Sequence, residues 1–210
     1  MSEAIIRPAS EQKNLQAAYI RAAAEQKNTQ AAYIRTAAEQ DIPQIHSIFS
    51  WYVQHTAVAF DYDPPALEDF ADRMRKIMDS YPFLVSEQDG RVTGYACAHA
   101  FVGREAYAWS AELTIYLAPD VRGQGTGRRL YGALEAELKR RGYLNLYACI
   151  GYPETEDEYL TKDSFHFHEH MGFHLAGTFQ NCGYKFGRWY HMVWMEKLIG
   201  PHIPQEHEPV

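Results

Sequence analysis

Apolar residues recur with the period of an α-helix in two stretches of the chain. The first stretch begins behind Asp41, a residue type that favours helix N-caps, and places Pro43 in the first turn. The second follows Pro64-Pro65 and continues to about Ser80. The apolar positions that define the two helices are Ile42, Ile45, Ile48, Phe49 and Tyr52 in the first, and Met74 and Met78 in the second.

Strand-like runs follow these two helices. Residues 83–86 and 92–100 flank Asp89-Gly90, a dipeptide typical of a two-residue hairpin turn. Further strands are expected at residues 110–118, 144–150, 173–182 and 189–197, with a short helix at residues 164–171 that Gly172 ends. Strands that alternate with helices, together with a hairpin, predict an α/β fold with a mixed sheet.

A glycine-rich turn joins the strand at residues 110–118 to a helix at residues 125–141. Its glycines let a ligand approach the backbone closely, and the free N–H groups at a helix start favour phosphate. The pattern is not that of a nucleoside triphosphatase, because Arg128 stands where that motif needs lysine. The dinucleotide-binding fingerprint, Gly-x-Gly-x-x-Gly, does not fit either.

The segment Arg122-Gly123-Gln124-Gly125-Thr126-Gly127 resembles the acetyl-CoA pyrophosphate loop of the GNAT superfamily of N-acetyltransferases. Within that superfamily the chain resembles phosphinothricin acetyltransferases through residues 104–112, 168–173 and 183–189. The resemblance implies a mixed, mostly antiparallel sheet with flanking helices. Two parallel central strands, residues 112–118 and 144–150, would splay apart to admit acetyl-CoA.

The resemblance also implies which residues contact acetyl-CoA. They are the backbone of Ile115, Tyr116 and Leu117, followed by Arg122, Gly123, Gln124, Gly125, Thr126, Gly127 and Arg128. Where the two strands splay, a backbone N–H near Leu117 would be free to stabilise the charge that grows on the thioester oxygen.

Glu112 is the candidate general base. A protonated amine must lose a proton before it attacks a thioester, so a base is needed within reach. Strand alternation puts Glu112 in an otherwise apolar strand, where burial would raise its pKa, and the resemblance assigns it the same role. The structural alternative is an ion pair with an arginine such as Arg104. The resemblance places His168 where it could protonate the departing thiolate.

By resemblance, an amino-acid-sized pocket would be lined by Phe60, Arg104, Tyr107 and Tyr184, with Arg104 meeting a substrate carboxylate. Phe60 and Tyr107 fit core packing equally well. Val102 stands where the best-known relatives carry lysine, which removes one anion partner. Residues 154–161 form a longer, acidic loop than theirs, which either reshapes the substrate mouth or is a solvated insertion.

Composition sets the wider expectations. A chain of 210 residues, 46% of them hydrophobic, can bury one sizeable core. A formal charge of -7 argues against a nucleic-acid binder, and the absence of an apolar span or signal peptide favours a cytoplasmic protein without a membrane anchor. Cys97, Cys149 and Cys182 are expected to be reduced core cysteines.

A run of histidines raises the question of a metal site. His166 and His170 have the spacing that shares a helical face, as do His170 and His174. Gly172 breaks the helix before His174, so no metal is expected.

The N-terminal region contains a tandem duplication. Residues 11–24 and 25–38 are the same fourteen residues except at two positions, and their composition favours helix. We expect a duplicated helical extension over residues 1–32, an acetyltransferase domain over residues 33–198 and a loose tail over residues 199–210. Of three Ile-Arg copies, the one in Tyr33–Thr36 is favoured as the first strand because it adjoins the domain. The extension is either a tolerated addition or an oligomerising or docking helix.

These observations predict an N-acetyltransferase that moves an acetyl group from acetyl-CoA to the primary amine of a small, amino-acid-like acceptor of the phosphinothricin or methionine sulfoximine type. The expected mechanism is direct attack in a ternary complex, and homodimers are common among relatives. Two alternatives stay open. One is an enzyme that acetylates a protein N-terminus or lysine, and the other is a non-catalytic CoA-binding sensor or interaction module.

Overall fold

The structure of the protein is a computed structural model that describes residues 32–204 and 207–209. The helical extension expected over residues 1–32 therefore lies outside the described residues, apart from Ala32.

The order of elements follows the sequence-based expectation. The strands are β1 (Tyr33–Thr36), β2 (Phe83–Gln88), β3 (Arg91–Ala100), β4 (Ser110–Leu117), β5 (Asn145–Tyr152), β6 (His174–Lys185) and β7 (Arg188–Leu198). The α-helices are α2 (Ile42–His55), α3 (Leu67–Ser80), α4 (Thr126–Arg141) and α5 (Asp163–His170), and short 3-10 turns are η1 (Glu39–Asp41), η2 (Glu105–Tyr107) and η3 (Pro119–Val121). The favoured Ile-Arg copy forms β1, which confirms that prediction.

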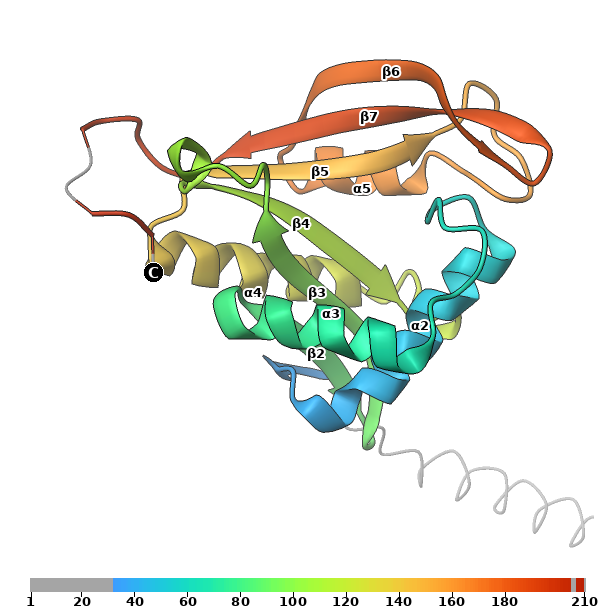
Figure 1. The fold of residues 1–210 in the computed structure, drawn as a ribbon, viewed down its shortest axis with the longest axis horizontal. Helices are drawn as coiled ribbons and strands as arrows, with labels where there is room; N and C mark the ends of the chain where they lie inside the picture. The colour runs from blue at the N-terminus through green and yellow to red at the C-terminus, as the bar shows by residue number, and fades with distance from the viewer. Residues whose placement is uncertain (1–31, 205–206, 210) are drawn as a thin grey trace, which may run out of the picture. The chain divides into compact units, whose positions relative to one another are not determined.

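The strands form one seven-stranded sheet in the order β1-β2-β3-β4-β5-β7-β6 (Figure 1). All neighbours are antiparallel except β4 and β5. The β4–β5 ladder runs only from the Ser110–Asn145 pair to the Glu112–Tyr147 pair. Beyond that point the two strands diverge, as Figure 1 shows, which confirms the predicted splay of two parallel central strands.

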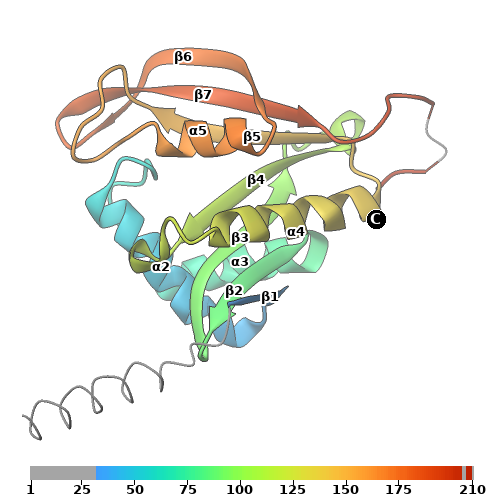
Figure 2. The ribbon, with the colours of Figure 1, turned by 180° about the vertical axis from the view of Figure 1, so that it is seen from behind.

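Helices cover both faces of the sheet (Figures 1 and 2). α2 and α3 bury apolar residues such as Ile45 and Phe70 against Val85 and neighbouring positions on one face. α4 and α5 lie on the other face, where Leu130 and Leu134 of α4 are fully buried. None of the described helices is long and apolar enough to cross a membrane.

The predicted hairpin turn is present between β2 and β3. Asp89 and Gly90 both have a positive φ, 51° and 77°, which is the geometry of the two-residue turn that matches strand twist. The prediction from this dipeptide is confirmed because its conformational preference is local.

Asp41 occupies the N-cap position of α2, but its carboxylate does not cap that helix. It accepts a hydrogen bond from the Ala38 N–H at 2.8 Å and pairs with Arg35 at 2.6 Å. Arg35 holds the pKa of the Asp41 carboxyl below its usual value. This residue therefore ties β1 to the start of α2.

The cysteine prediction is right for one residue and wrong for two. Cys97 is buried, whereas Cys149 and Cys182 are exposed, and all three are free. Apolar neighbours along β5 and β6 suggested burial, but both strands have an open face at these positions.

Candidate active site

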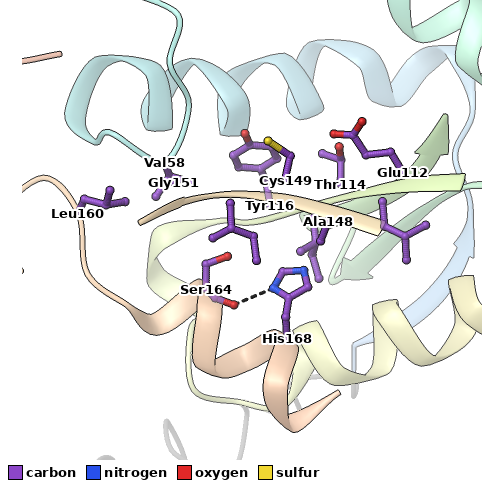
Figure 3. Close-up of a pocket in the computed structure, with 13 residues that line it drawn as sticks. Val58, Glu112, Thr114, Tyr116, Ala148, Cys149, Gly151, Leu160, Ser164 and His168 are labelled. Carbon is purple, nitrogen blue, oxygen red and sulfur yellow. Dashed lines mark hydrogen bonds between the residues drawn. The ribbon is translucent and has the colours of Figure 1, made fainter. Parts of the chain in front are cut away.

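The divergence of β4 and β5 opens a cavity of about 70 Å³ in the sheet, which we call the central cavity. Side chains reach it from both faces, as Figure 3 shows. Those on β4 and β5 include Glu112, Thr114, Tyr116, Cys149 and Gly151, those from α5 are Ser164 and His168, and Val58 and Leu160 lie at one end. The cavity therefore has walls from elements on both faces of the sheet.

Glu112 stands at the last position where β4 pairs with β5, and its side chain lines the central cavity. Its side chain is 21% exposed, and this burial raises the pKa of the carboxyl, while His99 lowers it. A carboxylate with a raised pKa is suited to accept a proton near neutral pH.

Within the described part of the chain, His99 is the basic side chain that faces this carboxylate, and no ion pair joins Glu112 to Arg104, the partner that the sequence suggested. His99 lies opposite Glu112 in the β3–β4 ladder, with Nδ1 at 3.9 Å from Oε2. Sequence reasoning missed this neighbour because the register of the two strands decides it. At this distance the two groups interact through charge and not through a direct hydrogen bond.

His168 is almost fully buried and both of its ring nitrogens are engaged. Nδ1 donates to the Ser164 carbonyl at 2.7 Å (Figure 3), so Nε2 accepts the hydrogen bond from the Tyr131 hydroxyl at 2.9 Å. Burial lowers the pKa of His168 to about 4. The imidazole is therefore neutral at neutral pH. The acid role expected for it stays a prediction, and these contacts weigh against it.

A groove of about 420 Å³ continues from the central cavity along the glycine-rich turn. It shares Val58, Ile115, Tyr116 and Ser164 with the cavity, so the two are continuous. Its other lining residues are Tyr52, Leu117, Arg122, Gly123, Gly125, Thr126, Gly127, Arg128, Thr161, Asp163 and Phe167. Every residue predicted to contact acetyl-CoA, except Gln124 of the same turn, lines this groove.

The glycine turn has a conformation that favours an anion. Gly123 and Gly125 both have a φ of 75°, and Gly125 is the N-cap of α4. The first N–H groups of a helix have no partner within it, and the positive end of the helix dipole lies beside them. Arg122 and Arg128 add positive charge to the same wall. The groove therefore fits a ligand that carries phosphate groups.

Tyr52 fixes the end of β4, a contact that sequence reasoning did not identify. Its hydroxyl donates to the Leu117 carbonyl at 2.8 Å and accepts a hydrogen bond from Arg122 at 3.0 Å. The Ala118 N–H bonds to Thr93 of β3, and strand groups alternate in direction, so the Leu117 N–H faces the gap beside β5. The end of β4 therefore turns the Leu117 N–H toward the side of the strand where the groove lies.

The residues predicted to line an acceptor pocket lie outside the lining of the central cavity. Phe60 packs against Gly151 and Gly183 near the central cavity, and Tyr184 stacks at 4.9 Å on Trp189 in the β6–β7 hairpin. Arg104 and Tyr107 are exposed on the connection between β3 and β4. None of these four lines the central cavity, so their roles stay predictions.

Two segments instead supply the end of the cavity that lies away from Glu112, and we call them together the outer wall. They are residues 56–62, which follow α2, and residues 154–161, the acidic loop before α5. Val58 comes from the first and Leu160 from the second, and the Ala57 N–H donates to the Tyr159 carbonyl at 2.9 Å. The acidic loop is therefore packed at this end of the cavity, where Leu160 forms part of the wall.

The histidines around α5 make contacts of other kinds. His166 pairs with Glu169 at 2.9 Å, and His170 bonds to the His166 carbonyl at 2.6 Å. Across the described ranges, no three His, Cys, Asp or Glu side chains gather in a way that could hold a metal ion.

Most of the chain matches one known protein family. Residues 34–194 match the family model described as acetyltransferase (GNAT) domain. The matched stretch contains the cavity, the groove and the outer wall.

Curated relatives and solved structures agree with that match. The chain is 35% identical over 160 residues, 76% of this chain and 78% of the relative, to phosphinothricin N-acetyltransferase of Alcaligenes faecalis. It is 30% identical, over 77% of this chain and 91% of the relative, to the L-methionine sulfoximine/L-methionine sulfone acetyltransferase of Salmonella typhimurium. A phosphinothricin acetyltransferase structure from Sinorhizobium meliloti in complex with AcCoA aligns with a TM-score of 0.77 and 30% identity, over 84% of this chain and 95% of that one.

Proposed function

The chain belongs to the GNAT acetyltransferase family, and we propose that it transfers an acetyl group from acetyl-CoA to the primary amine of a small, amino-acid-like acceptor. One observation carries the proposal: the half-buried carboxylate of Glu112 stands where β4 and β5 part, beside the groove built by the glycine turn. Relatives named for phosphinothricin and methionine sulfoximine support the acceptor class.

The groove is the site that would hold acetyl-CoA. The N-terminus of α4, Arg122 and Arg128 would meet its phosphates, and the β4 backbone from Ile115 to Leu117 would lie along its arm. The left-handed glycines at 123 and 125 leave that surface without side chains, which suits close approach of a ligand. Bound acetyl-CoA supplies the acetyl group as an activated thioester.

Glu112 acts as the general base in this proposal. It takes the proton of the acceptor amine, which must be neutral to attack, from the face of the sheet that also carries Thr114 and Cys149. The Glu112 side chain, which is 21% exposed, then passes the proton to solvent. The amine attacks directly while both substrates are bound: a C–N bond forms to the acetyl carbon, the C–S bond of the thioester breaks, and CoA leaves as a thiolate that takes a proton from solvent.

The Leu117 N–H serves as the donor to the oxygen that gains charge during the attack. It faces the gap between the strands, and Tyr52 holds the same residue through its carbonyl. A donor fixed before the reaction needs no reorganisation when the charge develops, which is the source of its effect.

The test is thiol release from acetyl-CoA over a panel of amino acids and amine analogues. Wild type should release thiol in an acceptor-dependent way, and Glu112→Gln should lower kcat by about 100- to 10,000-fold. Because the pKa of Glu112 is raised, wild-type kcat/KM should fall as the pH drops through that raised value.

Glu105→Gln, which removes an exposed carboxylate ahead of β4, is the matched control and should leave kcat unchanged. Acetyl-CoA affinity by titration calorimetry should be the same in both variants. Release that does not collapse in Glu112→Gln would remove the assigned base. Release only with peptide N-termini would replace the small acceptor by a protein substrate.

A further inference from the structure

The tip of the β6–β7 hairpin contains a buried lysine that the chemistry above does not use. Lys185 is 2% exposed, and Nζ donates to three backbone carbonyls, those of Val53 at 2.7 Å, Thr56 at 3.0 Å and Ala59 at 2.7 Å. Three acceptors satisfy all three ammonium hydrogens. Burial of an ammonium without hydrogen-bond partners is costly in free energy. Here the three carbonyls offset that cost, and the ammonium in turn holds one particular backbone segment in place.

The segment held by Lys185 is the end of α2 and the start of the outer wall. Val53 and Thr56 carry carbonyls at the C-terminal end of α2, the negative end of the helix dipole. Ala59 follows Val58, which lines both the central cavity and the groove. In Figure 1 the hairpin tip, the loop before α5 and the C-terminal end of α2 lie at the same end of the sheet.

The same hairpin tip also holds the other half of the outer wall. Arg188 forms a bidentate pair with Glu158 at 2.9 Å and reaches Asp157 at 2.9 Å. Asp157 in turn accepts the Tyr190 hydroxyl at 2.9 Å and the Leu160 N–H at 2.9 Å. Leu160, the residue that lines the cavity, is thus anchored to β7 through Asp157.

The turn itself is strained in a way that fits this role. Phe186 has a φ of 51°, an uncommon conformation for a bulky residue, and Gly187 has a φ of 76°. The Phe186 ring stacks on Tyr159 at 4.3 Å and lies 5.0 Å from the Lys185 ammonium. These contacts compensate the backbone cost and fix the side chains on either side of the turn.

We propose that Lys185 is a positioning residue for acceptor binding: its ammonium sets the place of Val58 in the cavity through the three carbonyls, and the β6–β7 tip thereby determines the space left for the acceptor. The proposal rests on the acetyl transfer proposed above. Lys185 lines neither the central cavity nor the groove, so it would act on binding only through the backbone segment that it holds.

Lys185→Met keeps the apolar stem and removes the three donors. We expect kcat/KM for the acceptor to fall roughly 10- to 100-fold, mainly through KM, while the acetyl-CoA Kd from calorimetry changes less than about twofold. Hydrogen–deuterium exchange at residues 57–60 should become faster, a readout that needs no turnover. Lys197→Met is the matched control, because Lys197 also donates to a carbonyl, that of Met171 at 2.7 Å, outside the outer wall.

Gly183→Ala disturbs the same segment without touching the ammonium. A Cβ at this position would stand 2.8 Å from the Phe60 ring, which would push residues 56–62 aside. This variant should also raise the acceptor KM, by less than Lys185→Met, and it decides the question if Lys185→Met does not fold.

The outcomes separate the two proposals. If Lys185→Met or Gly183→Ala lowers Tm as Lys197→Met does but leaves the acceptor KM and the exchange at residues 57–60 unchanged, the positioning role is wrong. If wild type transfers no acetyl group to any acceptor, the proposed function fails, and the exchange experiment still reports whether Lys185 holds the segment.

Discussion

The groove and the outer wall meet at the central cavity, yet the chain builds them in opposite ways. The groove comes largely from residues 115–128, where left-handed glycines and the start of α4 set the shape. The outer wall comes from residues 56–62 and 154–161, which hydrogen bonds from a distant hairpin hold in place. The first is therefore a locally encoded site, and the second depends on contacts far apart in the chain.

The groove and the outer wall should therefore affect the binding of different substrates. Changes in the groove should act on acetyl-CoA binding, and changes in the outer wall should act on the acceptor. Val58 and Thr161 are the residues of the outer wall that also line the groove. Because the remaining residues of the two regions are separate, the two sets of effects on free energy should be nearly additive. Four sets of measurements, built on five variants, are described in order from the largest expected effect to the smallest.

His168 lines the central cavity but has the contacts of a core residue. The pKa of His168 is about 4 in the folded state against an ordinary 6.5, so between these two pH values the unfolded chain binds a proton at this residue and the folded chain does not. The contribution to stability is complete above pH 6.5 and is lost as the pH falls toward 4, by about 3 kcal/mol in all. Urea unfolding of wild type at pH 7.5 and pH 4.5 should show this loss.

His168→Leu should abolish most of that pH dependence and, by leaving the buried Tyr131 hydroxyl unpaired, should cost about 1–3 kcal/mol at pH 7.5. The same change at exposed His174 should alter neither quantity. A large fall in kcat with the pH dependence of unfolding intact would instead favour the acid role.

Gly125→Ala tests whether the groove is encoded by local backbone conformation. A Cβ at this position meets no atom within 4 Å, so only the φ of 75° opposes it, at a cost of about 1–2 kcal/mol. Acetyl-CoA should bind about 5- to 30-fold more weakly by calorimetry, with the acceptor KM unchanged. Gly132→Ala, in the middle of α4 with open space, should leave binding unchanged and stabilise the helix by about 1 kcal/mol.

Tyr52→Phe and Tyr62→Phe compare the two halves with one chemical change. Tyr52 loses its bond to the Leu117 carbonyl, which should lower kcat/KM for acetyl-CoA by about fivefold. Tyr62 loses a bond of the same length, 2.8 Å, to the Tyr184 carbonyl, but it is 69% exposed and water replaces the partner. Its effect should be less than about twofold and confined to the acceptor KM. Steady-state kinetics in which either variant changes both substrates would show that the halves are coupled.

His99→Gln should have the smallest effect. Removing a group that lowers the pKa of Glu112 lets burial raise it further, so the acid limb of kcat/KM should move to higher pH. The plateau at high pH should not change, and pH–rate profiles measured side by side would show it. A limb that stays in place would mean that the two side chains titrate independently.

Much of the fold could be predicted from the sequence because its signals are local. The helical period around Ile45 and the Asp89-Gly90 turn need no knowledge of the rest of the chain. The glycine turn could be predicted for the same reason, and the residues expected to hold acetyl-CoA line one groove.

The remaining site could not be predicted because strand register and side-chain burial decide it. Nothing in the chain places His99 opposite Glu112 until β3 and β4 pair. A lysine in a polar motif is expected at the surface, yet Lys185 is buried against α2. Cys149 was expected in the core and instead lines the cavity, since the gap between β4 and β5 exposes that face of β5.

The gap between β4 and β5 also separates the strands that are synthesised first from those that are synthesised later. Strands β1 to β4 are antiparallel neighbours in chain order, with α2 and α3 between β1 and β2. Strands β5, β6 and β7 all follow later in the chain. A nascent chain thus completes the first four strands while the outer edge of β4 has no neighbour, and exposed strand edges promote aggregation. In the finished protein β5 covers only the first part of that edge, and the part left open is the one where Leu117 lines the groove. The end of β4 near Leu117 is thus an unpaired strand edge while the chain is being synthesised, and in the folded protein the same backbone lines the ligand groove.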